Sequence, residues 1–202
     1  KKGDASYRVE AAAIESFAKL QPPDAGNVLP TLLDRDSNAE EIRSAALSGL
    51  GMLTEADGLE TLLAWTKPGK PRECRGAAMR GIAELAKNVH LSDSALDKTV
   101  HTLLESTSGE QPRIQRTLID TLQKLGEGAR PALPYLRALS TNAPQSRTRK
   151  AAKEAVEKIT AAAPDKTELK DVREELTKLK DENKELRKRL EKLEAKPAKG
   201  EE

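Results

Sequence analysis

The sequence is short of the residues on which several kinds of fold and site depend. Aromatic residues make up 2% of its 202 residues, and there is one cysteine. So few aromatics disfavour a β-sandwich and provide no stacking platform for nucleic-acid bases. A single cysteine, Cys74, excludes a disulfide within the chain. No apolar run approaches the roughly 18 residues of a transmembrane helix, so we expect no membrane span.

A strong charge of one sign is also absent. The formal net charge is +2, although 34% of the residues are charged. A balanced composition of this kind gives no overall field that would recruit nucleic acid, so binding to nucleic acid is disfavoured. No signal-peptide pattern opens the chain, and the sequence leaves the cellular compartment open.

What the sequence does contain is a pattern of apolar residues that recurs along the chain. Over residues 7–20, apolar residues at i, i+3, i+4, i+8 and i+11 form one face of a helix. The five copies are Val9, Ala12, Ala13, Phe17 and Leu20; Ile42, Ala45, Ala46, Leu50 and Leu53; Cys74, Ala77, Ala78, Ile82 and Leu85; Ile114, Thr117, Leu118, Leu122 and Leu125; and Thr148, Ala151, Ala152, Val156 and Ile159. Their steps of 33, 32, 40 and 34 residues indicate repeats of two helices each.

Shorter apolar stretches between the copies predict the first helix of each pair. The sequence therefore predicts an all-α fold, a right-handed α-solenoid of about five helical pairs over residues 1–161. Cys74 takes the place of Ile42 in its copy, so we expect it to pack in the core. The first copy is a second helix with no first helix before it. We therefore expect the natural protein to extend further towards its N-terminus.

Two family resemblances follow from particular motifs. An apolar residue followed by arginine, as in Ile42-Arg43 and Cys74-Arg75, with Ala-Ala and a spaced leucine after it, resembles HEAT repeats. That resemblance covers residues 1–161. More narrowly, residues 4–13 (DASYRVEAAA), with Phe17-Ala18-Lys19-Leu20 after them, are similar to the C-terminal HEAT-like region of bacterial zinc aminopeptidases of the aminopeptidase N family.

The second resemblance implies that this chain is the non-catalytic part of a larger peptidase. In that family, zinc is held on an upstream domain by a His-Glu-x-x-His motif. Neither His90 nor His101 begins such a motif, and the sequence has no nucleophile elbow and no phosphate-binding glycine loop. We therefore expect no catalytic residue, no metal ligand and no cofactor in this chain, with zinc only if an upstream peptidase domain exists.

The C-terminal part of the chain has a different period. After a linker at 162–168, residues 169–196 predict one long coiled-coil helix, with residues 197–202 as a disordered tail. Heptad positions a and d hold Leu169, Val172, Leu176, Leu179, Asn183, Leu186, Leu190 and Leu193. In a parallel homodimer all four flanking pairs would attract: Glu168 with Arg173, Glu175 with Lys180, Glu182 with Arg187, and Arg189 with Glu194. Asn183 favours in-register two-stranded pairing. The alternative is a single solvated helix with internal ion pairs.

The charges divide unevenly along the solenoid. Residues 34–63 hold seven acidic residues, whereas residues 111–153 hold nine basic ones. The basic residues that could line a concave face are Arg113, Arg116, Arg147, Arg149 and Lys150. Such a face could bind an acidic peptide or nucleic acid. The alternative is that these side chains are spread over outer faces and loops.

Three functions fit the sequence. The first is a non-catalytic scaffold and dimerisation region at the C-terminus of a zinc aminopeptidase. The second is a protein-protein interaction scaffold unrelated to any peptidase, and the third is a nucleic-acid binder with a basic face. The full reading frame upstream of residue 1 would separate the first two.

Overall fold

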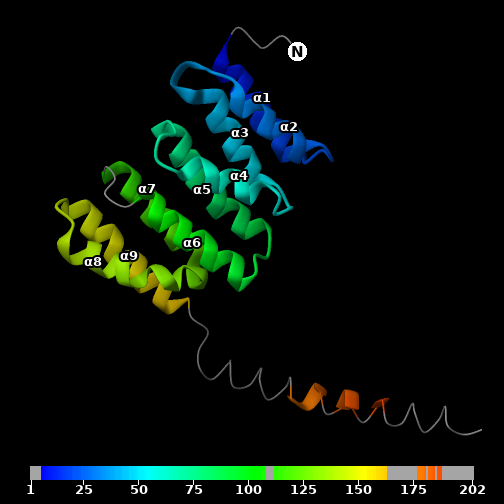
Figure 1. The fold of residues 1–202 in the computed structure, drawn as a ribbon, viewed down its shortest axis with the longest axis vertical. Helices are drawn as coiled ribbons and strands as arrows, with labels where there is room; N and C mark the ends of the chain where they lie inside the picture. The colour runs from blue at the N-terminus through cyan, green and yellow to red at the C-terminus, as the bar shows by residue number, and fades with distance from the viewer. Residues whose placement is uncertain (1–5, 108–111, 163–176, 181, 185, 188–202) are drawn as a thin grey trace, which may run out of the picture. The chain divides into compact units, whose positions relative to one another are not determined.

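A computed structural model of the chain describes residues 6–107, 112–162, 177–180, 182–184 and 186–187. The chain divides into two compact units, Lys1–Ala162 and Ala163–Glu202. Every regular element in these described residues is a helix, and strands are absent from them (Figure 1). The prediction of an all-α fold is confirmed for this part of the chain.

The helices of the first unit alternate between two roles. The second helices of the pairs are α1 (Tyr7–Leu20), α3 (Glu41–Met52), α5 (Arg72–Asn88), α7 (Pro112–Leu125) and α9 (Ser146–Ala161). The first helices are α2 (Ala25–Thr31) with η1 (Leu32–Asp34), α4 (Gly58–Thr66), α6 (Asp93–Thr107), and η3 (Gly126–Ala132) with α8 (Leu133–Asn142). A short turn of 3₁₀ helix, η2 (Asn38–Glu40), precedes α3.

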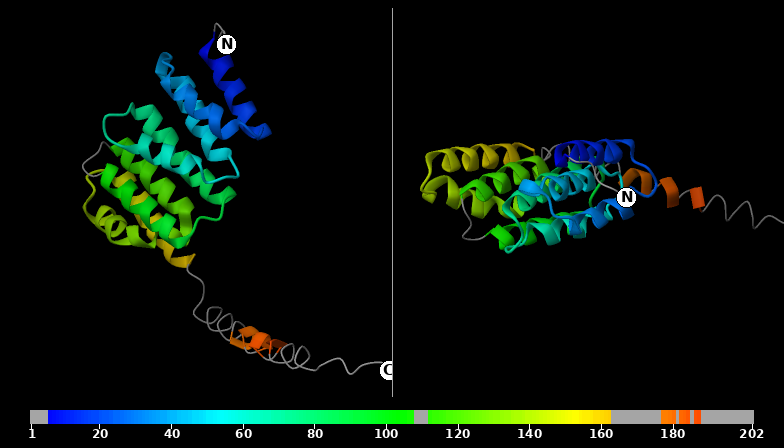
Figure 2. Two further views of the ribbon diagram at one scale, coloured as in Figure 1. Left: turned by 45° about the vertical axis from the view of Figure 1, so that its right-hand side comes forward. Right: turned by 90° about the horizontal axis from the view of Figure 1, so that it is seen from above.

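Packing between these helices repeats along the unit. Each second helix packs on the next one, so that α1, α3, α5, α7 and α9 form a continuous row. Each first helix packs on the second helix that follows it, as α2 does on α3 and α4 on α5. The helices thus succeed one another from α1 at one end of the unit to α9 at the other (Figures 1 and 2).

The first position of the repeated pattern is buried in most copies. Ile42 and Cys74 are fully buried and Ile114 is 2% exposed. Thr148 occupies the same position in α9 and is also buried, although its hydroxyl has no hydrogen-bond partner. The predicted register of the repeats is confirmed at these positions.

The predicted buried stripe is wrong for α1. Val9 is 55% exposed and Leu20 is 81% exposed. Instead, Ile14 and Ala18 are the buried residues of this helix. The reason is that α1 packs on α2 and α3, whereas no described helix covers the face that in α3 is covered by α2. One face of α1 therefore lies open.

Glycine allows the second helices to approach one another closely. A Cβ atom added to Gly51 in α3 would lie 2.5 Å from both the Cα atom and the carbonyl oxygen of Gly81 in α5. A Cβ atom on Gly81 would lie 2.8 Å from the carbonyl oxygen of Leu47. At the equivalent place one repeat later, the Thr121 hydroxyl donates a hydrogen bond to the Met79 carbonyl (3.2 Å). These backbone contacts fix how neighbouring second helices are aligned.

The arginine of the repeated motif joins the two helices of a pair. Arg43 Nε donates to the Leu33 carbonyl (2.7 Å), and Arg75 Nε donates to the Thr66 carbonyl (2.8 Å). Both carbonyls lie in the last turn of a first helix, where they lack an intrahelical partner. Arg75 is 5% exposed and also donates from Nη2 to the Ser106 carbonyl (2.8 Å) in α6. The motif is thus a structural clamp between consecutive helices.

We expect Gly51→Ala to destabilise the first unit by about 2 kcal/mol, because the new methyl group would overlap backbone atoms that cannot move aside. The matched control is Gly26→Ala in α2, where an added Cβ meets nothing within 4 Å. That change should stabilise the chain by ~0.4–1 kcal/mol, because alanine has less conformational freedom than glycine in the unfolded chain. Urea unfolding followed by circular dichroism compares the two variants. Equal stability of Gly51→Ala and the wild-type chain would contradict the close approach.

Candidate binding groove

A groove of about 420 Å³ crosses the exposed side of the second helices. Four successive helices, α1, α3, α5 and α7, contribute to its lining. Its charged residues are Glu15, Glu41, Arg72, Glu73, Arg80 and Arg113. We call it the second-helix groove.

The repeat explains why a groove forms here. Ala11, Ser44 and Gly76 occupy equivalent positions in α1, α3 and α5, and all three line the groove. Because these residues are small, they leave space above the helix backbones, and this space forms the floor of the groove. A Cβ atom on Gly76 would meet only the Arg80 guanidinium, at 3.3 Å. The equivalent position in α7 holds Arg116, a large side chain.

Some charges in the groove are already paired. Arg72 Nη2 lies 2.9 Å from Glu73 Oε1. This hydrogen bond is the main reason why the pKa of Glu73 is lowered, and the charge of Arg113 contributes less. Glu41 Oε1 accepts a longer hydrogen bond from Nε of the exposed Arg8 (3.4 Å).

Other charges in the groove have no such partner. Glu15, Arg80 and Arg113 form no ion pair with any residue in the described part of the chain. An unpaired charge at the rim of a groove can bind an opposite charge without first breaking an internal contact. These three side chains are therefore the ones best placed to contact a ligand.

The predicted basic residues do not all lie together. Arg113 lines the groove, and Arg116 is exposed one turn further along α7. Arg147 and Lys150 are exposed at the equivalent positions of α9, and Lys150 lies 3.9 Å from Glu154. Arg149 is different, because its Nη1 donates to the carbonyls of Ala143 (2.6 Å) and Pro144 (3.0 Å). It repeats the clamp of Arg43 and Arg75.

Five charged residues of the groove were missed from the sequence. They are Glu15 and Glu41 from α1 and α3, and Arg72, Glu73 and Arg80 from α5. A signal for them exists: Glu41, Glu73 and Arg113 share one repeat position, and Glu15 and Arg80 share another. Comparing repeat positions across helices, rather than counting charges along the chain, would have found them.

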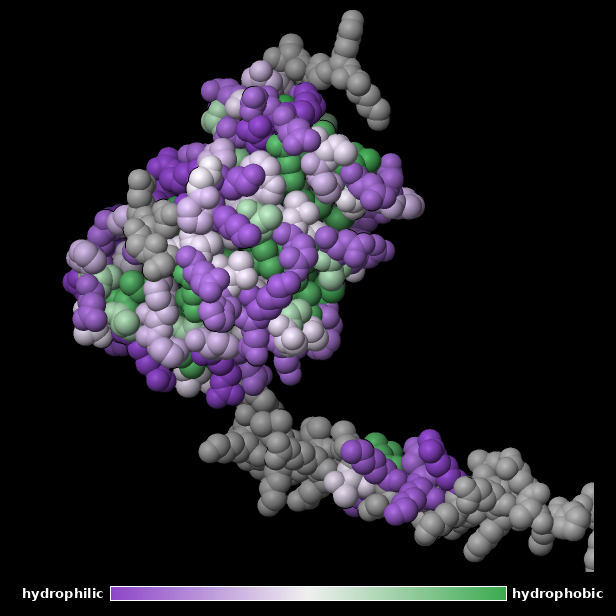
Figure 3. Space-filling model, viewed as in Figure 1, coloured by the Kyte–Doolittle hydropathy of each residue, from purple (hydrophilic) through white to green (hydrophobic). Residues whose placement is uncertain are grey.

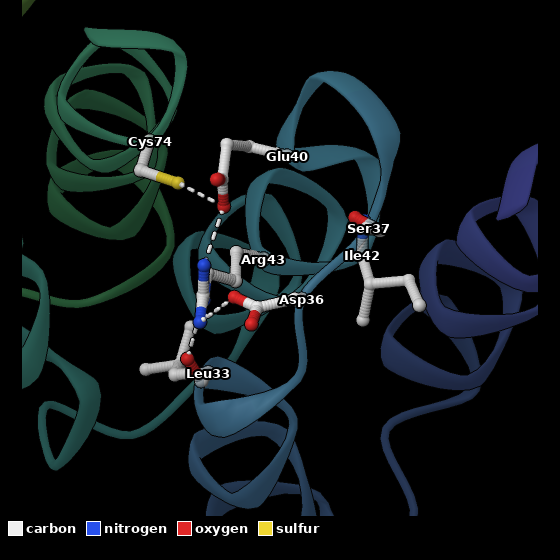
Figure 4. A network of polar contacts seen from close by, with 7 residues as sticks. All are labelled: Leu33, Asp36, Ser37, Glu40, Ile42, Arg43 and Cys74. Carbon is white, nitrogen blue, oxygen red and sulfur yellow. Dashed lines mark hydrogen bonds and ion pairs between the residues drawn. The ribbon is translucent and has the colours of Figure 1, made fainter. Parts of the chain in front are cut away.

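A polar network holds the rim of the groove beside η2 (Figure 4). Arg43 Nη1 lies 2.8 Å from Glu40 Oε2, and Nη2 lies 2.6 Å from Asp36 Oδ1. The hydrogen bond to Glu40 is the main cause of the raised pKa of Arg43. The backbone here is strained, because Ala39 and Glu40 have φ of 51° and 59°. Ala39, a lining residue of the groove, precedes Glu40 of this network and has a left-handed backbone conformation that residues other than glycine rarely adopt.

The network also includes the single cysteine. Cys74 Sγ donates a hydrogen bond to Glu40 Oε2 (3.6 Å). Burial is the main cause, and the charge of Glu40 a further one, of a pKa raised to about 12. A buried thiol with this pKa is protonated at neutral pH and is therefore a poor nucleophile. As predicted, Cys74 is a core residue.

A second hollow, of about 810 Å³, lies at α6 and η3 and is lined by Asp97, Val100, His101, Leu104, Glu105 and Pro131. On the face shown in Figure 3, hydrophilic residues predominate and hydrophobic residues appear in small areas between them. His101 Nδ1 lies 3.3 Å from Glu105, and both side chains are exposed. Among the residues that the structure describes, no three His, Cys, Asp or Glu side chains are grouped as a metal site would require. The described helices are also too short or too polar to cross a membrane.

The predicted dimerisation residues lie in the second unit. Leu179, Asn183 and Leu186 belong to its described residues, 177–180, 182–184 and 186–187, which are helical. Leu179 is 62% exposed and Leu186 is 59% exposed. The other predicted positions, Leu169, Val172, Leu176, Leu190 and Leu193, lie outside the described residues. The coiled coil stays a prediction.

Comparison with known proteins agrees with the helical pairs. A family model described as HEAT repeats matches residues 2–83. Together with the all-helical structure of the described residues, this match supports a HEAT-like helical repeat. The search of curated proteins found no match to the chain.

We expect the native Cys74 thiol to react with iodoacetamide at pH 8 at least ~100-fold more slowly than the unfolded chain, because burial and the raised pKa suppress the thiolate. Because the folded chain keeps a proton that the unfolded chain releases near pH 9, stability due to Cys74 is lost as the pH rises from 9 towards 12. Cys74→Ala should lack this part of the pH dependence. Rapid alkylation of the native chain would show that the thiol is accessible.

Proposed function

We propose that this chain is a non-catalytic interaction scaffold that binds a protein segment in the second-helix groove. The observation that carries the proposal is a groove lined by four successive second helices, in which Glu15, Arg80 and Arg113 form no ion pair with any described residue. Solenoid repeats use surfaces of this kind, made by several repeats together, to bind partners.

Rigidity of the groove supports this function. The backbone contact between Gly51 and Gly81 aligns α3 and α5, and the Thr121 hydrogen bond aligns α5 and α7. The hydrogen bond from Arg43 holds η1, which follows α2, against α3. The hydrogen bond from Arg75 holds α4 against α5. A groove formed in advance loses little conformational entropy on binding, and this raises affinity for a given set of contacts.

We further propose that the superhelix is right-handed and that residues 169–196 pair two chains as a parallel coiled coil. Support for the pairing comes from Leu179 and Leu186, which are seven residues apart, exposed, and in described helical residues. The four attractive pairs between positions g and e support the same arrangement. Dimerisation would present two grooves on one particle and so increase avidity for a partner with two binding segments.

A peptidase context is the second candidate function. It depends on the resemblance of residues 4–13 and 17–20 to the C-terminal region of the aminopeptidase N family. In that context, the scaffold would shape access to a zinc site held upstream. A His-Glu-x-x-His motif upstream in the full reading frame would support this candidate, and an upstream sequence without it would remove it.

We expect a groove-filling substitution to abolish binding of peptides selected from a random display library against the full chain. Gly76→Tyr places a ring on the groove floor, where the Arg80 guanidinium is the one neighbour of an added Cβ within 4 Å. The control Ala64→Tyr places the same ring on an exposed position of α4. Affinity measured by fluorescence anisotropy should fall at least ~10-fold in Gly76→Tyr and stay unchanged in Ala64→Tyr. Unchanged binding by a folded Gly76→Tyr variant would end the groove proposal.

We expect sedimentation velocity to show a dimer of the full chain. Asn183→Leu should raise the thermal stability while allowing other oligomeric states, because the buried asparagine pair specifies two strands and destabilises the seam. A matched control is Lys184→Leu, which adds the same apolar side chain at a position outside a and d. Monomers in the wild-type chain and in Asn183→Leu alike would refute the coiled coil.

A further inference from the structure

The charges of the second-helix groove follow an order along the stack. Its charged residues from α1 and α3 are Glu15 and Glu41. Those from α5 and α7 are Arg72, Glu73, Arg80 and Arg113. Since Arg72 and Glu73 pair with each other at 2.9 Å, the charges left at this end are Arg80 and Arg113. The groove is thus acidic at one end and basic at the other.

Neither end of the groove is fully neutralised by ion pairs with other described residues. Arg8 contacts Glu41 at 3.4 Å but is itself exposed, and exposed ion pairs of this kind are weak and screened by salt. Glu15, Arg80 and Arg113 have no ion pair with a described residue. The basic end also continues onto the next helix, because Arg147 and Lys150 of α9 repeat the positions of Arg113 and Arg116.

We propose that the second-helix groove binds an extended polypeptide segment of mixed charge, with its basic residues over α1 and α3 and its acidic residues over α5 and α7. This inference rests on the proposed function and adds the chemistry of the partner. A uniformly acidic segment would bring its carboxylates against Glu15 and Glu41, and such like-charge contacts are destabilising. A uniformly basic segment would meet the same opposition from Arg80 and Arg113.

The spacing of the helices gives the spacing of the charges in the ligand. Packed helix axes are about 8–10 Å apart, so the two ends of the groove are separated by two to three spacings, roughly 16–30 Å. An extended chain advances about 3.3 Å per residue. The basic and acidic clusters of the ligand should therefore be about five to nine residues apart.

Nucleic acid fits this groove less well than a mixed-charge peptide. A strand laid across the four helices would bring its phosphates against Glu15 and Glu41 at one end. Since the phosphate backbone is negative throughout, no shift along the groove avoids both acidic residues while keeping the strand over all four helices. Discrimination against such ligands comes from repulsion at one end of the groove as much as from attraction at the other.

The test compares four synthetic probes with the full chain at low ionic strength. The first peptide has two lysines and two glutamates separated by seven Ser/Gly residues, and the second has the same composition with the charges alternating. The third has glutamates at both ends, and the fourth probe is single-stranded oligo-dT. We expect the clustered mixed-charge peptide to bind at least ~10-fold more tightly than each of the others.

Two charge changes sharpen the test. Glu15→Lys should cancel the negative charge at the acidic end, where Glu41 remains, and should therefore reduce the preference for the clustered peptide over the peptide with glutamates at both ends. The control Asp97→Lys makes the same change of charge on α6, at an exposed position outside the groove, and should leave the preference of the wild-type chain unchanged. Arg80→Glu should weaken binding of the clustered peptide at least ~10-fold. Circular dichroism confirms that each variant is folded.

The outcomes separate this inference from the proposed function. Equal affinity for the clustered and alternating peptides, or tighter binding of the acidic peptide or of oligo-dT, would overturn the inferred charge order. If none of the four probes binds but library-selected peptides bind and are lost in Gly76→Tyr, the charge inference fails and the scaffold function stands. If the selected peptides bind Gly76→Tyr normally, the scaffold function fails.

Discussion

Close contact between the second helices is the constraint on which the rest of the structure depends. Gly51 and Gly81 let α3 and α5 meet backbone to backbone, and the Leu47 carbonyl lies where a side chain on Gly81 would be. No side chain can be inserted there without separating the two helices. The same alignment continues into α7 through the Thr121 hydroxyl. Every position on the exposed side of these helices, including the lining of the groove, is placed by this alignment.

A second set of contacts converts a row of helices into a stack of pairs. Arg43, Arg75 and Arg149 recur in the repeat and donate to carbonyls at or just after the C-terminal end of a first helix. In this way one buried or half-buried cation satisfies backbone groups that would otherwise lack a partner. Arginine suits this role because its several donors keep a fixed geometry. The charges that line the groove are a separate set, and three of them, Glu15, Arg80 and Arg113, form no ion pair with a described residue.

Periodicity alone predicted the helices and most of the core. Ile42, Cys74 and Ile114 are buried as the pattern requires, because each of these helices has neighbours on both sides. Val9 and Leu20 follow the same pattern and yet are exposed, since burial depends on a neighbouring helix that the pattern itself does not supply. The candidate site was predicted less well. Arg113 was identified, but Arg149 belongs to a clamp, and Glu15 and Arg80 become groove residues only when helices far apart in sequence lie side by side.

The exposed face of α1 affects which helices of this unit unfold locally first. In a repeat protein, each unit is stabilised by its neighbours, so a helix packed on one side is held less firmly than one packed on both. Tyr7, Val9 and Leu20 gain little from burial, whereas the interior copies of the pattern gain fully. In this chain, the amide hydrogens of α1 should consequently exchange with solvent before those of α5, which has helices packed on both sides.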